Sequence, residues 1–252
     1  MLYPLPINNL FFTTRSQEKG ETTISLLENF ISKLKTVPKN INLKYYILDV
    51  VNIDQINQLS LNLTKNKTKI DLFIYNSGIF ILKNKFKISN VKKTIDINFT
   101  GPRLIFETLL KNNNLTTDAK ISVVSSQMGQ FYVIKHDPVL TKKLSLYQSS
   151  DFTENNVFEA VENYVNQMQD FELAKKNTQE VYSMSKLLVT IYFSTLSRKY
   201  PNMHFLALCP GWCITDMTKG MPAPRSSADG GKDIIQGIIP VSYTHLTLPT
   251  KA

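Results

Sequence analysis

The chain has 252 residues, of which 42% are hydrophobic and 19% are charged. This length suits one large domain with a substantial core, and the composition excludes a disordered or fibrous protein. The formal net charge of +9 raises nucleic-acid binding as a hypothesis, but the lysines are scattered and only four arginines occur. We therefore expect a solvated, lysine-rich surface and no nucleic-acid partner.

Cysteine usage and hydropathy set further limits. Cys209 and Cys213 are the only cysteines, too few for a disulfide framework or for the four ligands of a structural zinc site. No apolar run approaches the ~20 residues that a membrane span needs. We expect reduced thiols, no metal, no membrane partner and a cytoplasmic location.

Short apolar runs alternate with helical patterns along the chain, which predicts a parallel sheet covered by helices. The third of these runs leads into the polar sequence Asn76, Ser77 and Gly78. In this first part of the chain we expect strands at 9–14, 45–49 and 71–75, and helices at 17–35 and 53–64.

The second part continues this alternation with one interruption. Residues 130–178 are polar and contain one helical stretch, from about 155 to 168. The tail, residues 241–252, continues no pattern and resembles a translated sequencing-adapter read-through, so we exclude it from the fold. We expect a long helix at 92–110 that is interrupted near Gly101 and Pro102, strands at 120–124 and 204–209, and helices at 179–200 and 227–235.

Tyr182 and Lys186 form a candidate catalytic pair, because residues four apart lie on one face of a helix. The lysine ammonium can lower the pKa of the phenol from its ordinary value of about 10. Such a tyrosine exchanges a proton with a carbonyl or alcohol oxygen near neutral pH. With 11 tyrosines in the chain, the pair alone is weak evidence, since it also fits a half-buried tyrosine beside a snorkelling lysine.

The context of the pair strengthens it. Asn76 and Gly78 end one predicted strand, Asn98 lies in the next helix, and Ser126 ends the strand that precedes the Tyr182 helix. Every one of these polar groups falls at the carboxyl edge of a parallel sheet or on an adjoining helix. Open α/β folds bind their ligands at this edge.

With these motifs in this order, the chain resembles the short-chain dehydrogenase/reductase family, and most of all its monomeric NADPH-dependent carbonyl reductases. The resemblance covers residues 10–239 and implies an α/β fold, a Rossmann-type doubly wound parallel sheet. It implies an oxidoreductase that reduces the carbonyl group of a ketone or aldehyde to an alcohol by a Ser-Tyr-Lys mechanism.

The resemblance also implies the role of each catalytic residue. Ser126 orients the substrate carbonyl, and Tyr182 acts as the acid and base. Lys186 lowers the pKa of Tyr182 and binds the nicotinamide ribose, while Asn98 holds a water molecule in a proton relay with Lys186.

Further residues are implied to hold the cofactor and the substrate. Asn76 and Gly78 support the sheet beside the cofactor, and Trp212 lines the substrate pocket. The residues implied to hold the nicotinamide are Pro210, Gly211 and Thr215.

The choice between cofactors rests on the residue that ends the second strand of such folds, which meets the adenosine ribose. If the strand at 9–14 takes that position, Arg15 stands at the ribose with Lys19 one helical turn later. Cations there suit a 2′-phosphate and favour NADPH. Asp49, after the next strand, would lie by the adenine. Alternatively, Arg15 and Lys19 simply begin a solvated helix face.

The sequence departs from the family at its start. The family begins with a strand and a glycine-rich turn whose N–H groups bind the pyrophosphate, but no glycine precedes Gly20. We expect a single incomplete Rossmann domain over 1–240, lacking its first strand and its last, so that the strands at 9–14 and 71–75 have no shared neighbour. The simplest interpretation is a fragment, which need not be active itself. The alternative is a non-catalytic nucleotide-binding or scaffold remnant.

The spacing between Ser126 and Tyr182, 56 residues, is long for the family. The monomeric carbonyl reductases carry a helical insertion of this size at the same place. In relatives without it, the helix that bears the tyrosine helps to form a dimer interface. An insertion at about 130–178 therefore argues for a monomer.

Overall fold

The computed structural model describes most of the chain. The predicted tail at 241–252 and much of the predicted insertion lie outside this part. The described residues are 7–33, 41–129, 149, 151–170, 172 and 178–239.

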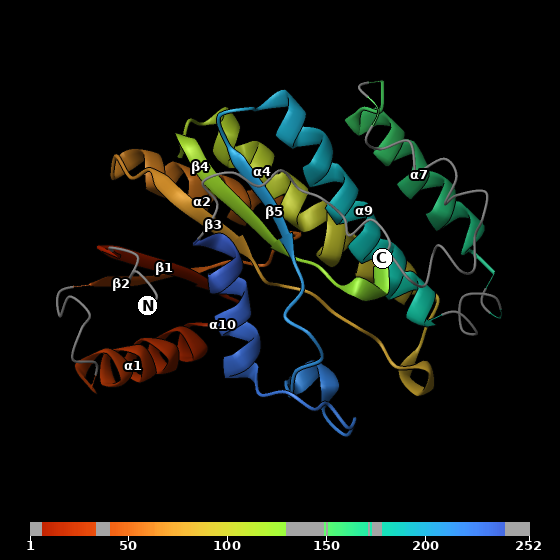
Figure 1. Cartoon of the computed structure of the whole chain (residues 1–252), viewed down its shortest axis with the longest axis horizontal. Helices are drawn as coiled ribbons and strands as arrows, with labels where there is room; N and C mark the ends of the chain where they lie inside the picture. The colour runs from red at the N-terminus through yellow and green to blue at the C-terminus, as the bar shows by residue number, and fades with distance from the viewer. Residues whose placement is uncertain are drawn as a thin grey trace.

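Within these ranges, five strands form two separate parallel sheets (Figure 1). One sheet pairs β1 with β2, and the other has the order β3-β4-β5. The predicted loss of a shared neighbour is confirmed, since no pairing joins β1 to β3 among the described residues. The strands are β1 (Asn9–Thr14), β2 (Asn42–Ile47), β3 (Ile70–Tyr75), β4 (Leu115–Val124) and β5 (His204–Leu208).

Helices cover both faces of the strands, as a doubly wound fold requires. In Figure 1, α1 and α10 lie on one side of the strands, and α2, α4 and α9 lie on the other. The α-helices are α1 (Gln17–Lys33), α2 (Ile53–Lys65), α3 (Ser89–Ile95), α4 (Gly101–Lys111), α7 (Glu154–Gln167), α9 (Thr178–Lys199) and α10 (Ser227–Ile238), and short helical turns span Lys83–Lys85, Asp96–Thr100 and Asp216–Thr218.

The helix expected at 92–110 is interrupted next to Gly101 and Pro102, as predicted, although it already begins at Ser89 and the break takes the form of a π-helical turn. It is divided into α3, a π-helical turn (Asp96–Thr100) and α4. Pro102 has no N–H to donate to a carbonyl of the preceding turn, and its ring crowds that turn. A local widening to π geometry is one way in which a helix accommodates such a break.

Two strands also begin earlier than predicted. β2 begins at Asn42 and β4 at Leu115, because each extends through polar residues that carry no hydrophobic signal. β4 is the central strand of its sheet, and Ala119, Ile121 and Val123 on it are fully buried.

The core divides between the two faces. The larger cluster lies on the side of α2, α4 and α9, and a smaller one forms where Ile234 and Ile238 of α10 pack against Leu206 of β5. In α9, side chains are buried around the whole helix from Ser183 to Leu196, which marks a helix enclosed on all sides.

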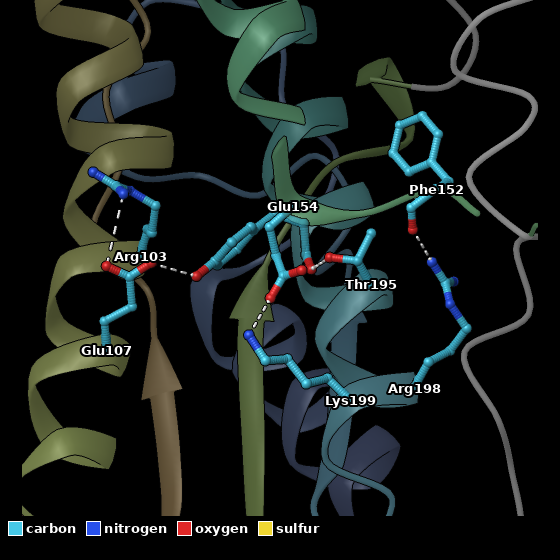
Figure 2. A network of polar contacts seen from close by, with 8 residues as sticks. Arg103, Glu107, Phe152, Glu154, Thr195, Arg198 and Lys199 are labelled. Carbon is cyan, nitrogen blue, oxygen red and sulfur yellow. Dashed lines mark hydrogen bonds and ion pairs between the residues drawn. The ribbon is translucent and has the colours of Figure 1, made fainter. Parts of the chain in front are cut away.

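The outer cover of α9 is α7, which lies beyond it in Figure 1. Figure 2 shows the polar contacts that join them: Lys199 Nζ meets Glu154 Oε1 at 2.8 Å, and Arg198 donates to the Phe152 carbonyl at 2.7 Å. These contacts attach the amino-terminal end of α7 to the carboxyl-terminal end of α9.

Helix α7 also contacts α4. Arg103 of α4 lies 5.0 Å above the ring of Phe158 and forms an ion pair with Glu107 at 3.6 Å. Glu107 accepts a 2.9 Å hydrogen bond from the hydroxyl of Tyr192, whose ring lies 5.9 Å from that of Phe158. The predicted helical part of the insertion therefore packs across α4 and α9. None of the described helices is long and apolar enough to cross a membrane.

Candidate active site

The second and third turns of α9 present Tyr182 and Lys186 at the carboxyl edge of the β3-β4-β5 sheet. Lys186 is only 4% exposed, and its Nζ donates a 2.7 Å hydrogen bond to the carbonyl of Val124, the last residue of β4. The same Nζ lies 5.8 Å from the centre of the Tyr182 ring. The strand end thus fixes the lysine beside the tyrosine.

Ser126 completes this cluster from the other side. It follows β4 by two residues, and its hydroxyl forms a hydrogen bond with the Tyr182 phenol. The Oγ atom also accepts a 3.2 Å hydrogen bond from the Met128 amide, which orients the side chain. Residues far apart in the chain, Ser126 and Tyr182, are therefore in direct contact.

The electrostatics differ from the sequence expectation. Burial raises the pKa of Tyr182 above its ordinary value, and the hydrogen bond with Ser126 opposes this only in part. Burial also lowers the pKa of Lys186 to about 8. The expected lowering of the Tyr182 pKa by Lys186 is not seen, because desolvation disfavours the charged form of both groups.

Asn98 lies in the π-helical turn and is 1% exposed. Its Oδ1 accepts from the Ile79 amide at 2.8 Å, and its Nδ2 donates to the Ile79 carbonyl at 3.0 Å and to Ser185 Oγ at 2.9 Å. Ser185 Oγ in turn donates to the Tyr182 carbonyl at 2.6 Å. Asn98 therefore ties the loop after β3 to the second turn of α9.

Ser185 is a residue that the motif analysis missed, although it directly precedes Lys186. Phe80 is another, since its ring meets the Tyr182 ring edge-on with a centroid distance of 5.3 Å. No sequence pattern pointed to Phe80, because the contact joins the loop after β3 to α9.

Gly78 lies where these elements meet. A Cβ atom there would lie 3.2 Å from Lys186 Nζ and 3.4 Å from Asn98 Oδ1, so glycine allows the loop after β3 to approach both. Asn76 lies one residue beyond β3 and is exposed. The structure thus brings Gly78 into the cluster, whereas Asn76 stands at its solvent side.

The segment after β5 forms another wall. Cys209 interacts electrostatically with both Tyr182 and Lys186. Trp212 follows and is 47% exposed. Thr215 is exposed and precedes a short helical turn, where its amide donates to Thr218 Oγ1 at 2.9 Å. Pro210 and Gly211 form the turn itself, which is held by Arg225, a third residue that the motif analysis missed.

The residues predicted to meet the adenosine lie at the ends of β1 and β2. Arg15 and Lys19 are exposed, at the junction of β1 and α1. Asp49 lies two residues beyond β2, and its Oδ1 accepts from the Val51 amide at 3.2 Å. Its charge acts on Tyr75 at the end of β3, so the carboxyl ends of β2 and β3 lie at a common edge.

The sequence matches the family described as short chain dehydrogenase over residues 11–139. Together with the parallel strands, their helices on both faces and the Ser126, Tyr182 and Lys186 cluster, this match defines the class as an oxidoreductase. The chain belongs to the short-chain dehydrogenase family.

Individual relatives are distant. The chain is 24% identical over 228 residues to (+)-neomenthol dehydrogenase of Arabidopsis thaliana, covering 81% of this chain and 74% of that protein. It is 23% identical to carbonyl reductase [NADPH] 1 of Mus musculus, covering 89% and 79%. Among solved structures, salutaridine reductase from Papaver somniferum superposes with a TM-score of 0.75 at 18% identity, covering 90% and 85%. This last likeness shows the fold.

Proposed function

We propose that the protein uses NADPH to reduce the carbonyl group of a ketone or aldehyde to an alcohol. The observation that carries this proposal is the meeting of Ser126, Tyr182 and Lys186 at the end of β4, where Ser126 is hydrogen-bonded to the phenol and the Lys186 ammonium lies 5.8 Å from its ring. A protonated phenol that meets a carbonyl oxygen can donate the proton that reduction requires, and a neighbouring ammonium stabilises the phenolate that remains.

In this mechanism Tyr182 donates its proton to the carbonyl oxygen, and Ser126 Oγ supplies a second hydrogen bond to the same oxygen. The bound dinucleotide supplies the hydride. Lys186, whose pKa of about 8 leaves it mostly protonated near pH 7, then stabilises the phenolate. We propose two roles for Asn98. Through Ser185 it fixes the position of the α9 turn that carries Tyr182 and Lys186, and it orders a water molecule near Lys186.

At the nicotinamide end, the buried Lys186 ammonium beside Tyr182 is the group that would meet the ribose of such a cofactor. Arg15 and Lys19 supply two exposed cations for a 2′-phosphate. One relative is named as an NADPH-dependent carbonyl reductase, and one structural neighbour, ElxO, is described with NADP bound. No glycine occurs among residues 1–19, so these residues do not themselves supply a glycine-rich turn for the pyrophosphate.

We also propose that the substrate is apolar. Met128, Trp212 and Ile214 are exposed large hydrophobic side chains in the segments that follow β4 and β5. Exposed apolar residues grouped at a site favour an apolar ligand. We further propose a single domain, acting as a monomer because α7 covers α9, and a cytoplasmic location, in keeping with the free thiols of Cys209 and Cys213.

The test is the oxidation of NADPH by the purified chain in the presence of cyclic and aromatic ketones and aldehydes, followed by absorbance. We expect Tyr182→Phe to reduce turnover by roughly a hundredfold or more, with unchanged circular dichroism. Tyr46→Phe is the control, because it removes a hydroxyl on β2, outside the proposed site, and keeps the ring that packs against Phe11. Turnover that survives in Tyr182→Phe would contradict the mechanism. NADPH binding without any turnover would favour the non-catalytic alternative.

A further inference from the structure

The turn after β5 is held from outside by Arg225. The Pro210 carbonyl accepts one hydrogen bond from Arg225 Nη1 at 3.1 Å and another from Cys213 Sγ at 3.2 Å. Gly211 has a positive φ of 78°, and a Cβ there would lie 2.7 Å from Arg225 Nη1. Glycine at this position therefore serves both the turn and the approach of the guanidinium.

The other side of the guanidinium is held by α10. Arg225 Nη2 lies 2.6 Å from Asp233 Oδ2. The helix that carries Asp233 is anchored on the sheet through Ile234 and Ile238. The arginine thus connects the turn to a helix that is fixed against the strands.

The backbone of Arg225 closes a loop. Its carbonyl accepts a 2.8 Å hydrogen bond from the Ile214 amide, and Cys213 pairs with Arg225 in an isolated parallel bridge. A Cβ on Gly230 would lie 2.4 Å from Cys213 Sγ, so the start of α10 packs closely on the same point. Residues 214–225 therefore form a loop whose two ends meet beneath the proposed nicotinamide turn.

We propose that Arg225, paired with Asp233, is a positioning residue that fixes the Pro210–Gly211 turn and the base of the 214–225 loop, and thereby sets the affinity for the cofactor. The consequence for affinity rests on the proposed function. The two side chains are 36% and 42% exposed, and ion pairs this exposed contribute little to global stability. The expected effect is therefore local.

Trp212 is a built-in reporter of this turn, because it is the only tryptophan in the chain and follows Gly211 directly. The variants are Arg225→Ala, Arg225→Lys and Asp233→Asn, compared with Lys232→Ala, which removes an exposed charge from α10. We expect Arg225→Ala to shift Trp212 emission to longer wavelength and to speed tryptic cleavage after Lys219. The thermal midpoint should stay the same.

In Arg225→Ala we expect NADPH to bind about threefold to fivefold more weakly. A loss of affinity of this size corresponds to the free energy that one exposed ion pair contributes. The KM for NADPH should rise while kcat changes little. Arg225→Lys should lie between wild type and Arg225→Ala, because an ammonium can meet Pro210 or Asp233 but lacks the fork that reaches both. Asp233→Asn alone should weaken NADPH binding less than Arg225→Ala does. In the double variant it should weaken binding no further than Arg225→Ala alone, because both substitutions break the same ion pair.

Unchanged Trp212 emission and Lys219 cleavage in Arg225→Ala would overturn the inference. Equal changes in Lys232→Ala, or additive effects of the two substitutions, would do the same. If the wild-type chain binds no NADPH, that result contradicts the proposed function. Emission and cleavage would still decide the role of Arg225.

Discussion

Asn98 and Ser185, 87 positions apart in the chain, meet at 2.9 Å between the amide nitrogen and the hydroxyl oxygen, and both side chains are buried. Because Ser185 also donates to the Tyr182 carbonyl, the loop after β3, the π-helical turn and the start of α9 form one hydrogen-bonded unit. The catalytic tyrosine we propose is therefore oriented through its backbone as well as through Ser126.

The first prediction concerns this unit. Ser185→Ala removes one partner of the Asn98 amide, and leaving a buried donor without that partner costs about 1 to 3 kcal/mol. We expect the free energy of unfolding in urea to fall by that amount. Ser197→Ala is the control, because the Ser197 hydroxyl bonds a carbonyl of its own helix at 2.7 Å. Equal losses in the two variants would contradict a special role for Ser185.

The second prediction concerns pH. The pKa of Lys186 is about 8 in the folded chain, against an ordinary value of 10.5. Between these values the unfolded chain binds more protons, so stability rises as the pH rises from about 8 towards 10. From pH 8 to 9.5 the gain from this group is on the order of 1 to 2 kcal/mol. Above pH 10 the raised pKa values of Tyr75 and Tyr182 oppose it, since the unfolded phenols lose protons first.

The measurement is urea unfolding of wild type and Lys186→Met at pH 8 and pH 9.5. The methionine variant should lose the rise in stability with pH. It should also be the more stable protein at pH 7, where wild type must keep a charge buried. A parallel pH dependence in the two proteins would show that another group is responsible.

The third prediction tests α7 as the cover of α9. Val157 of α7 is fully buried, and Val157→Asp should detach this helix because a carboxylate cannot be buried there unpaired. The apolar face of α9 is then exposed. We expect wild type to sediment as a monomer and the variant to self-associate, whereas Glu159→Gln, an exposed change on α7, should leave the monomer intact. A monomeric Val157→Asp variant would oppose this view of α7.

The fourth prediction compares two helical glycines. At Gly231 no atom lies within 4 Å of an added Cβ, so Gly231→Ala should stabilise the chain by up to about 1 kcal/mol. At Gly20 the Cβ would lie 2.5 Å from the Tyr45 ring, so Gly20→Ala should instead destabilise it by about 1 to 3 kcal/mol. Thermal unfolding measures both. Stabilisation by both substitutions would mean that α1 can move away from β2.

Much of the fold follows from local signals. The alternation of apolar runs with helical periods predicted the strands and most helices, and the order of Asn98, Ser126, Tyr182 and Lys186 along the chain predicted the family. Both are properties of short segments and their sequence order. The break near Pro102 was also visible, because it depends on a single residue.

Only the tertiary structure decided how the site residues meet and which protonation states are favoured. The sequence spacing of Tyr182 and Lys186 predicted a lowered phenol pKa, but the pKa of Tyr182 is raised, because burial depends on the loop after β3 and on β4 as well as on α9. The contacts of Ser185, Phe80 and Arg225 escaped notice for the same reason. A residue's neighbours along a helix follow from its period, whereas its desolvation and its partners from other elements are set only when those elements pack together.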